Sequence, residues 1–145
     1  MKSNQLAMNT KSFITGTVTG AVGFFLVGFL FYGFILVDFF EANAGSATGV
    51  MKDQPNMALL FLGELAWGAL FTYIYLQWAN IRTFATGAKA GAILGFLLGL
   101  GFNLISVGTA NVMNLTGALV DSVVQLVMGA VAGGLIGLVL GKVSD

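Results

Sequence analysis

One glutamate, Glu64, lies inside a long apolar run, and no other side chain of the sequence is better placed to do chemistry. A carboxylate within the hydrocarbon region of a membrane costs about 2.5–3.5 kcal/mol on insertion scales, so it should face protein or water. Protonation, a hydrogen bond from a neighbouring helix, or a cationic ligand can each compensate this cost. Two interpretations follow: a site that binds a proton or cation, and a buried hydrogen bond that holds two helices in register.

Further polar side chains fall in the same half of their apolar segments as Glu64 and complete the candidate ligand- or proton-binding site. They are Tyr32, Asn103, Asp121 and Gln125. Structural interpretations compete here too, because amides hydrogen-bond between membrane helices and an acid in the first turn of a helix complements the helix dipole. For Asp121 the dipole interpretation is favoured. If the groups meet, they line a polar pocket on one side of the membrane.

The composition removes most other chemistry. The 145 residues contain no cysteine and no histidine, so disulfides, thiol catalysis and the common zinc, haem and iron–sulfur sites lack ligands. Six basic and six acidic side chains give zero net charge, without a basic patch for nucleic acid. We expect no metal, no cofactor and no catalytic residues. A lipid-modifying enzyme using Glu64 and Asp121 ranks low, since no nucleophile–base pair accompanies them.

The elements that must position these groups are membrane helices. Hydrophobic residues make up 57% of the chain and charged residues 8%, whereas soluble domains carry about 25% charged residues. A helix needs about 20 apolar residues to cross the hydrocarbon core. A single transmembrane domain, residues 1–145, is expected, with spans at about 12–37, 57–78, 86–107 and 115–140. The predicted fold class is all-α: an integral membrane four-helix bundle.

Basic residues predict how the bundle is oriented. All but one fall on one side of the expected spans: Lys2, Lys11, Arg82, Lys89 and Lys142. Because positive charge is retained in the cytoplasm, both termini are expected there. The apolar stretch after Lys11 is longer than the roughly 7–15 residues of a signal peptide, so we expect it to remain as a span.

Glycine recurs at every fourth position within the apolar runs. This spacing lets two helix backbones approach closely in lipid, where no hydrophobic effect drives helices together. The packing positions of this expected glycine zipper are Gly16, Gly20, Gly87, Gly91, Gly95, Gly99, Gly129, Gly133, Gly137 and Gly141. With the polar groups in the other half of each span, the pattern predicts tight packing on the cytoplasmic side and an open, polar-lined outer side.

The two halves of the chain look like copies of one helical hairpin. The expected copies are residues 12–80 and 84–141. The matching segments are Thr15–Val22 with Thr86–Ile93, and Glu64–Leu70 with Gln125–Val131. A two-span unit returns to its starting side, so the copies would share an orientation, with a symmetry axis along the membrane normal. Glu64 and Gln125 would then face each other across that axis.

Glycine- and aromatic-rich motifs extend along most of the chain, from about Gly20 to Gly141. They are Gly28–Phe34 leading to Asp38–Phe40, the pair Trp67–Gly68, and Ala118–Asp121 followed by Met128–Ala130. Together they resemble a family of small four-span bacterial inner-membrane proteins that carries a domain-of-unknown-function label. The resemblance implies four membrane helices and a bacterial inner membrane. It implies no activity, so no functional residues carry over.

Two functions of different classes remain open. In the first, the protein binds or moves a small molecule or ion through an outer-facing polar pocket centred on Glu64. The four-helix multidrug exporters are an analogy in size and charge pattern alone, because their single intramembrane glutamate lies in the first span. In the second, the protein is an accessory or assembly subunit that docks onto a larger membrane complex through its glycine-ladder faces. The expected partners are the lipid bilayer, a small molecule, and a homodimer mate or larger complex.

Overall fold

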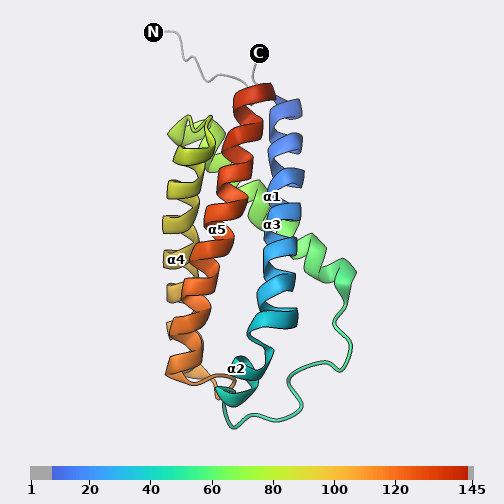
Figure 1. Ribbon diagram of the computed structural model, residues 1–145, viewed down its shortest axis with the longest axis vertical. Coiled ribbons are helices and arrows are strands. Elements are labelled where there is room, and N and C mark those ends of the chain that lie inside the picture. The colour runs from blue at the N-terminus through green and yellow to red at the C-terminus, as the bar shows by residue number, and fades with distance from the viewer. Residues whose placement is uncertain (1–7, 144–145) are drawn as a thin grey trace.

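Four long apolar helices account for most of residues 8–143, the part of the chain that the computed structural model describes. They run alternately up and down, so that α1 begins and α5 ends at the same end of the molecule (Figure 1). The elements are α1 (Thr10–Leu30), the π-helical turn η1 (Phe31–Ile35), α2 (Val37–Ala42), α3 (Met57–Ile74), the π-helical turn η2 (Tyr75–Ala79), α4 (Phe84–Thr109) and α5 (Leu115–Val143).

The predicted fold class is confirmed: the protein is an all-α, integral membrane four-helix bundle. Helical stretches long and apolar enough to cross a membrane cover Thr10–Ile35, Met57–Ala79, Phe84–Thr109 and Leu115–Val143. Their bounds differ from the expected ones by a few residues. The main difference is α2, a six-residue helix at the start of the expected loop. It forms because Asp38 in its first turn complements the helix dipole and Phe40 packs against the core.

Each long helix begins at a polar side chain that accepts hydrogen bonds from free backbone N–H groups. These caps are Asn9 for α1, Asn56 for α3, Thr83 for α4 and Asn114 for α5. Asn and Thr favour this position because their short side chains reach the second or third N–H of the helix. The same residues therefore end the loops and start the spans, which fixes the length of each connection.

α4 and α5 pack backbone against backbone along a glycine seam, which we define as Gly87, Gly91 and Gly95 facing Gly129, Gly133 and Gly137. A Cβ atom placed on Gly91 would strike the carbonyl oxygen of Gly129, and the reverse is equally true. Beyond the seam, Gly141 meets the backbone of Arg82 and Gly99 meets the Gln125 side chain. The close approach runs from the α3–α4 turn to the middle of the bundle.

α1 lies between α3 and α5, whereas α3 and α4 scarcely touch. Gly20 faces Gly68 of α3, and Gly16 faces Thr72 one turn further along. On its other side α1 meets α5, where Gly23 lies against the backbone of Ala132. The buried side chains that close the core around α5 are Phe24, Phe71, Tyr75, Val124, Met128, Ala132, Ile136 and Leu140.

Tyr75 joins the end of α3 to the α4–α5 pair. Its side chain is fully buried, and its hydroxyl donates a hydrogen bond of 2.6 Å to the carbonyl oxygen of Gly87. The hydroxyl also lies against Gly133, so it fills space beside the seam. Tyr75 is the first residue of η2, so this bond ties the end of the second span to α4, a helix that α3 itself scarcely touches.

Replacing Tyr75 by Phe should lower the free energy of unfolding by about 0.5–1.5 kcal/mol, because one hydrogen bond is lost while the ring packing stays. Equilibrium unfolding in mixed micelles, with sodium dodecyl sulfate as the denaturant, measures this. Tyr73→Phe is the matched control, since the Tyr73 side chain is 41% exposed and its hydroxyl has no hydrogen bond within residues 8–143. Equal losses in the two variants would contradict the assigned role of the Tyr75 bond.

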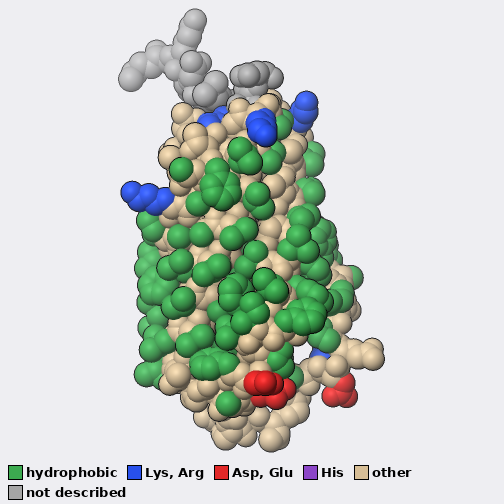
Figure 2. All heavy atoms as spheres, viewed as in Figure 1, with side chains coloured by type: hydrophobic (Ala, Val, Ile, Leu, Met, Phe, Trp, Pro, Cys, Tyr) green, Lys and Arg blue, Asp and Glu red, His purple; other side chains and the backbone are tan. Residues whose placement is uncertain are grey.

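Charged side chains gather at the two ends of the molecule. On the face drawn in Figure 2, most of the lysine and arginine atoms lie toward the end where α1 begins. The acidic side chains lie at the opposite end, beside one small basic area, and hydrophobic side chains cover the surface between. Lys11, Arg82 and Lys142 belong to the start of α1, the α3–α4 turn and the end of α5. Lys2, also expected at this end, lies outside the described residues.

Candidate functional site

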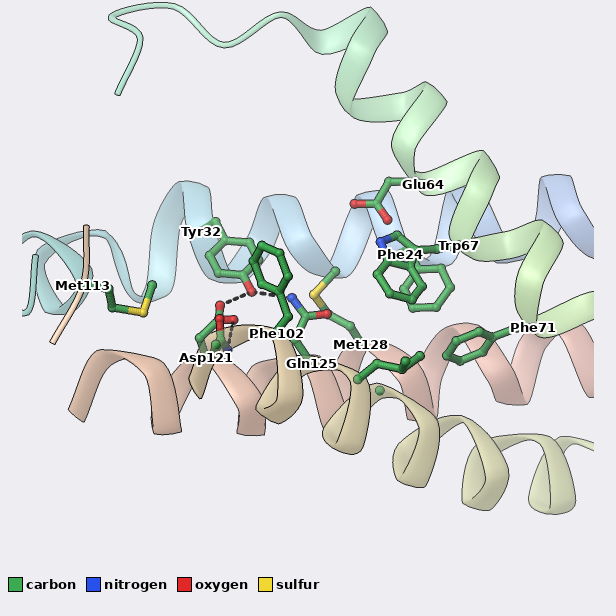
Figure 3. A pocket seen from close by; sticks show the side chains of 14 residues that line it. Phe24, Tyr32, Glu64, Trp67, Phe71, Phe102, Met113, Asp121, Gln125 and Met128 are labelled. Atoms are coloured by element: carbon green, nitrogen blue, oxygen red, sulfur yellow. Dashed lines mark hydrogen bonds between the residues drawn. The ribbon is translucent and has the colours of Figure 1, made fainter. Parts of the chain in front are cut away.

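A pocket of about 440 Å³ opens in the half of the bundle away from the chain ends, and all four long helical stretches contribute to its wall. Every polar candidate from the sequence lines it: Tyr32, Glu64, Asn103, Asp121 and Gln125. Figure 3 shows Glu64 of α3 on one side of the pocket and Tyr32 of η1 with Asp121 and Gln125 of α5 on the other. The five polar side chains therefore line one pocket and do not lie at separate helix–helix interfaces.

Four of the five polar side chains form one hydrogen-bonded network around Asp121. The Tyr32 hydroxyl donates to Asp121 Oδ1 at 2.5 Å, and Gln125 Nε2 donates to the same hydroxyl at 3.0 Å. Asn103 Nδ2 donates to Asp121 Oδ2 at 2.7 Å. Both carboxylate oxygens of Asp121 thus have a donor, and the network joins η1, α4 and α5.

The glycine seam explains how Asn103 reaches this network. Asn103 continues the row of Gly95 and Gly99 along one face of α4, so it points at α5 where the two backbones are close. Its amide nitrogen also lies 3.2 Å from the carbonyl oxygen of Ala118 and 3.2 Å from Ser122 Oγ. With the side chain 5% exposed, Asn103 is a buried link between α4 and α5.

The position of Asp121 in α5 contradicts the helix-dipole interpretation that the sequence favoured. α5 begins at Leu115, so Asp121 lies in the second turn and no acidic residue occupies the first. The dipole interaction falls off within the first turn. Tyr32 and Asn103 account for the position of the carboxylate instead, and this tyrosine partner comes from an element far away in the sequence.

Glu64 stands apart from the network. It is half-buried on α3 and faces the pocket opposite Tyr32 and Gln125 (Figure 3). Within residues 8–143 its carboxylate has neither a hydrogen bond nor an ion pair. Glu64 and Gln125, which the repeat places opposite each other, do line the same pocket. The Gln125 amide donates its hydrogen bond to the Tyr32 hydroxyl and not to Glu64. Among the described residues, Glu64 is the charged group of the pocket that has no hydrogen-bond or ion-pair partner.

The remaining wall is aromatic and thioether-rich, which the sequence interpretation missed. These lining side chains are Phe24, Trp67, Phe71, Phe102, Met113 and Met128. A signal was available on α3, since Trp67 and Phe71 follow Glu64 at i+3 and i+7 and so share its face. On α1 and η1, Phe24, Gly28 and Tyr32 follow one another at i+4.

The electrostatic character of the pocket is acidic. Glu64 and Asp121 line it, and its lining includes no lysine, arginine or histidine. Across the described residues, no three Asp or Glu side chains gather closely enough to hold a metal ion. Comparison of the chain with family models, curated proteins and solved structures finds no match. The site is an acidic pocket inside an integral membrane protein.

Proposed function

We propose that the protein binds a small molecule or ion in this pocket and that Glu64 is the charge-bearing group that meets it. The observation that carries the proposal is the contrast between the two carboxylates: Asp121 is engaged through both oxygens, whereas Glu64 faces the cavity without a partner. A carboxylate in a membrane span is costly unless something compensates its charge. A ligand in the pocket supplies that compensation.

The alternatives draw less support from the same contacts. A purely structural role for Glu64 needs a hydrogen bond across helices, and the pocket amides of Asn103 and Gln125 donate to other groups. An accessory subunit that docks through its ladder faces needs glycines free to meet a partner. Gly91, Gly129 and Gly133 instead contact each other's backbones within the chain, as a glycine zipper does. We propose no enzyme activity, since the lining offers no serine, cysteine or histidine nucleophile or base.

The proposed setting is a bacterial inner membrane with both chain ends in the cytoplasm and the pocket toward the outside. The basic end of the bundle supports this orientation, because lysine and arginine stay on the cytoplasmic side. The resemblance to a family of small four-span bacterial proteins supports the assignment to a bacterial inner membrane. A bundle of four helices is thin for a pathway of its own, so movement of the ligand across the membrane would use a homodimer.

The proposed internal repeat of two hairpins accounts for the place where the pocket opens. Aligned positions make corresponding contacts: Gly20 with Gly68 in the first hairpin parallels Gly91 with Gly129 in the second, and Gly16 with Thr72 parallels Gly87 with Gly133. A two-fold axis would match the α1–α5 interface with an α4–α3 interface. Between α3 and α4 this second interface is almost absent. The pocket opens where it would be.

Native mass spectrometry in a gentle detergent tests the proposal on the wild type, Glu64→Gln and Glu41→Gln. We expect the wild type and Glu41→Gln to retain a small molecule that Glu64→Gln loses, because the isosteric amide removes only the charge. Glu41 is exposed on α2 and outside the pocket lining, so the control makes the same chemical change elsewhere.

The free energy of unfolding decides between a ligand site and a structural role. It should change by less than about 0.5 kcal/mol in either variant, as for a substitution that breaks no internal contact. Identical unliganded species in all three samples would contradict the proposal. A large loss of stability confined to Glu64→Gln would assign the residue to packing.

A further inference from the structure

We propose that the ligand of this pocket is an organic monocation, an ammonium group on an apolar body, which enters from the lipid between α3 and α4. The inference rests on the proposed function and names its ligand class. Three features of the described residues carry it: the charge left unpaired in the pocket, the chemistry of the wall, and the place where the wall is open.

The charge of the pocket specifies a cation without an accompanying anionic group. Asp121 keeps its charge but accepts hydrogen bonds from Tyr32 and Asn103 on its two oxygens, so the carboxylate left free to contact a ligand is that of Glu64. A phosphate or carboxylate on the ligand would find no lysine or arginine in the lining. Burying such an unpaired anion is strongly unfavourable. A zwitterionic lipid headgroup therefore fits poorly, and a singly charged ammonium fits well.

The wall favours an organic cation over a metal ion. Trp67 lies one turn after Glu64 on the same face of α3, so an indole ring and a carboxylate are presented together (Figure 3). Aromatic faces attract cations, tryptophan most strongly, and the attraction grows when water is excluded. Phe24, Phe71 and Phe102 extend this surface. Bare alkaline-earth ions instead require a cage of several oxygens, and no three Asp or Glu side chains of the described residues gather closely enough to build one.

The opening lies toward lipid. α1 closes one side of the pocket by packing along α5, and the corresponding contact between α3 and α4 is missing. Trp67 of α3 and Phe102 of α4 both line the pocket and are 42% and 73% exposed. The volume of about 440 Å³ falls within the usual range for small organic ligands. An amphipathic amine dissolved in the bilayer can thus reach Glu64 without crossing the loops.

Tryptophan fluorescence can report this binding directly. Trp67 and Trp78 are the two tryptophans of the chain, and Trp78 lies in η2, outside the pocket lining. In a Trp78→Phe background the emission therefore comes from the pocket alone. The probe is 4-phenylbutyltrimethylammonium in uncharged maltoside micelles. Its comparison compound is the neutral analogue with a tert-butyl group in place of trimethylammonium.

We expect the cation to change Trp67 emission saturably and the neutral analogue to bind at least about tenfold more weakly, a difference of about 1.4 kcal/mol. Glu64→Gln should remove most of that preference, and Phe102→Leu should weaken the cation severalfold while keeping an apolar wall. Glu41→Gln should match its parent. The comparison of the two compounds and the Phe102 variant do not depend on whether Glu64→Gln folds.

Two results would overturn the inference. Equal binding of the cation and its neutral analogue would show that charge is not recognised. No binding of the cation, while native mass spectrometry still finds a molecule lost only in Glu64→Gln, would remove this ligand class and leave the proposed function standing. Absence of both signals would remove the proposed function as well.

Discussion

Valine in place of Gly91 should lower the free energy of unfolding by about 3 kcal/mol or prevent folding, the largest effect we expect from any single substitution in this chain. A Cβ at this position would overlap the carbonyl oxygen of Gly129 and press on the backbone of Gly133. Backbone atoms cannot turn aside as a flexible side chain can, so α4 and α5 must separate. Separation along the seam would also withdraw Asn103 from Asp121.

Gly101→Val is the matched control for this prediction. Gly101 lies on the same helix, and a Cβ there would meet no atom within 4 Å. The control should unfold at the same sodium dodecyl sulfate concentration as the wild type or at a slightly higher one, since valine favours a helix more than glycine does. Unfolding by sodium dodecyl sulfate in mixed micelles compares the variants. Similar midpoints for Gly91→Val and Gly101→Val would mean that the seam does not hold the two helices together.

Alanine in place of Asp121 should cost about 1.5–3 kcal/mol, the range for removing hydrogen bonds to a charged group. The Tyr32 hydroxyl loses its acceptor, and the buried Asn103 amide keeps only Ala118 and Ser122. Asp121→Asn should cost less, because an amide oxygen still accepts one of the two bonds. Equilibrium unfolding in micelles measures both variants.

Asp53→Ala controls for the loss of a carboxylate by itself. Asp53 is exposed in the loop before α3, so its removal should change the free energy of unfolding by less than about 0.5 kcal/mol. A loss at Asp121 no larger than at Asp53 would mean that the network is not a fixed part of the pocket. Retention of ligand by Asp121→Asn would further separate its structural role from that of Glu64.

The sequence was sufficient to predict the four spans and the polar residues that line the candidate pocket, because both depend on local signals. An apolar run of about 20 residues has few uses other than crossing a membrane. A carboxylate inside such a run stands out for the same reason, which is how Glu64 was found. The short helix α2 was missed because six residues are too few to display a helical period.

Pairing between distant elements could not be predicted in the same way. Glycine at every fourth position indicates that a helix face approaches something closely, without saying that Gly91 meets Gly129. The partner of Asp121 is Tyr32, and this contact depends on how α1 lies against α5. Phe24 and Phe102 were missed because an aromatic residue in an apolar span has the same local pattern whether it faces lipid, core or ligand.

The central position of α5 has a consequence for biogenesis. Of the four long helices it is the most buried, and it contacts both α4 and α1 extensively. Helices leave the ribosome in chain order, so α5 is the last of the four to enter the bilayer. Before it arrives, Gly87 and Gly91 of α4 and Gly23 of α1 have only acyl chains against them. α1 and α3 can pack against each other as soon as both have emerged, whereas the contacts of α4 with α5 and of α1 with α5 have to wait for the last helix.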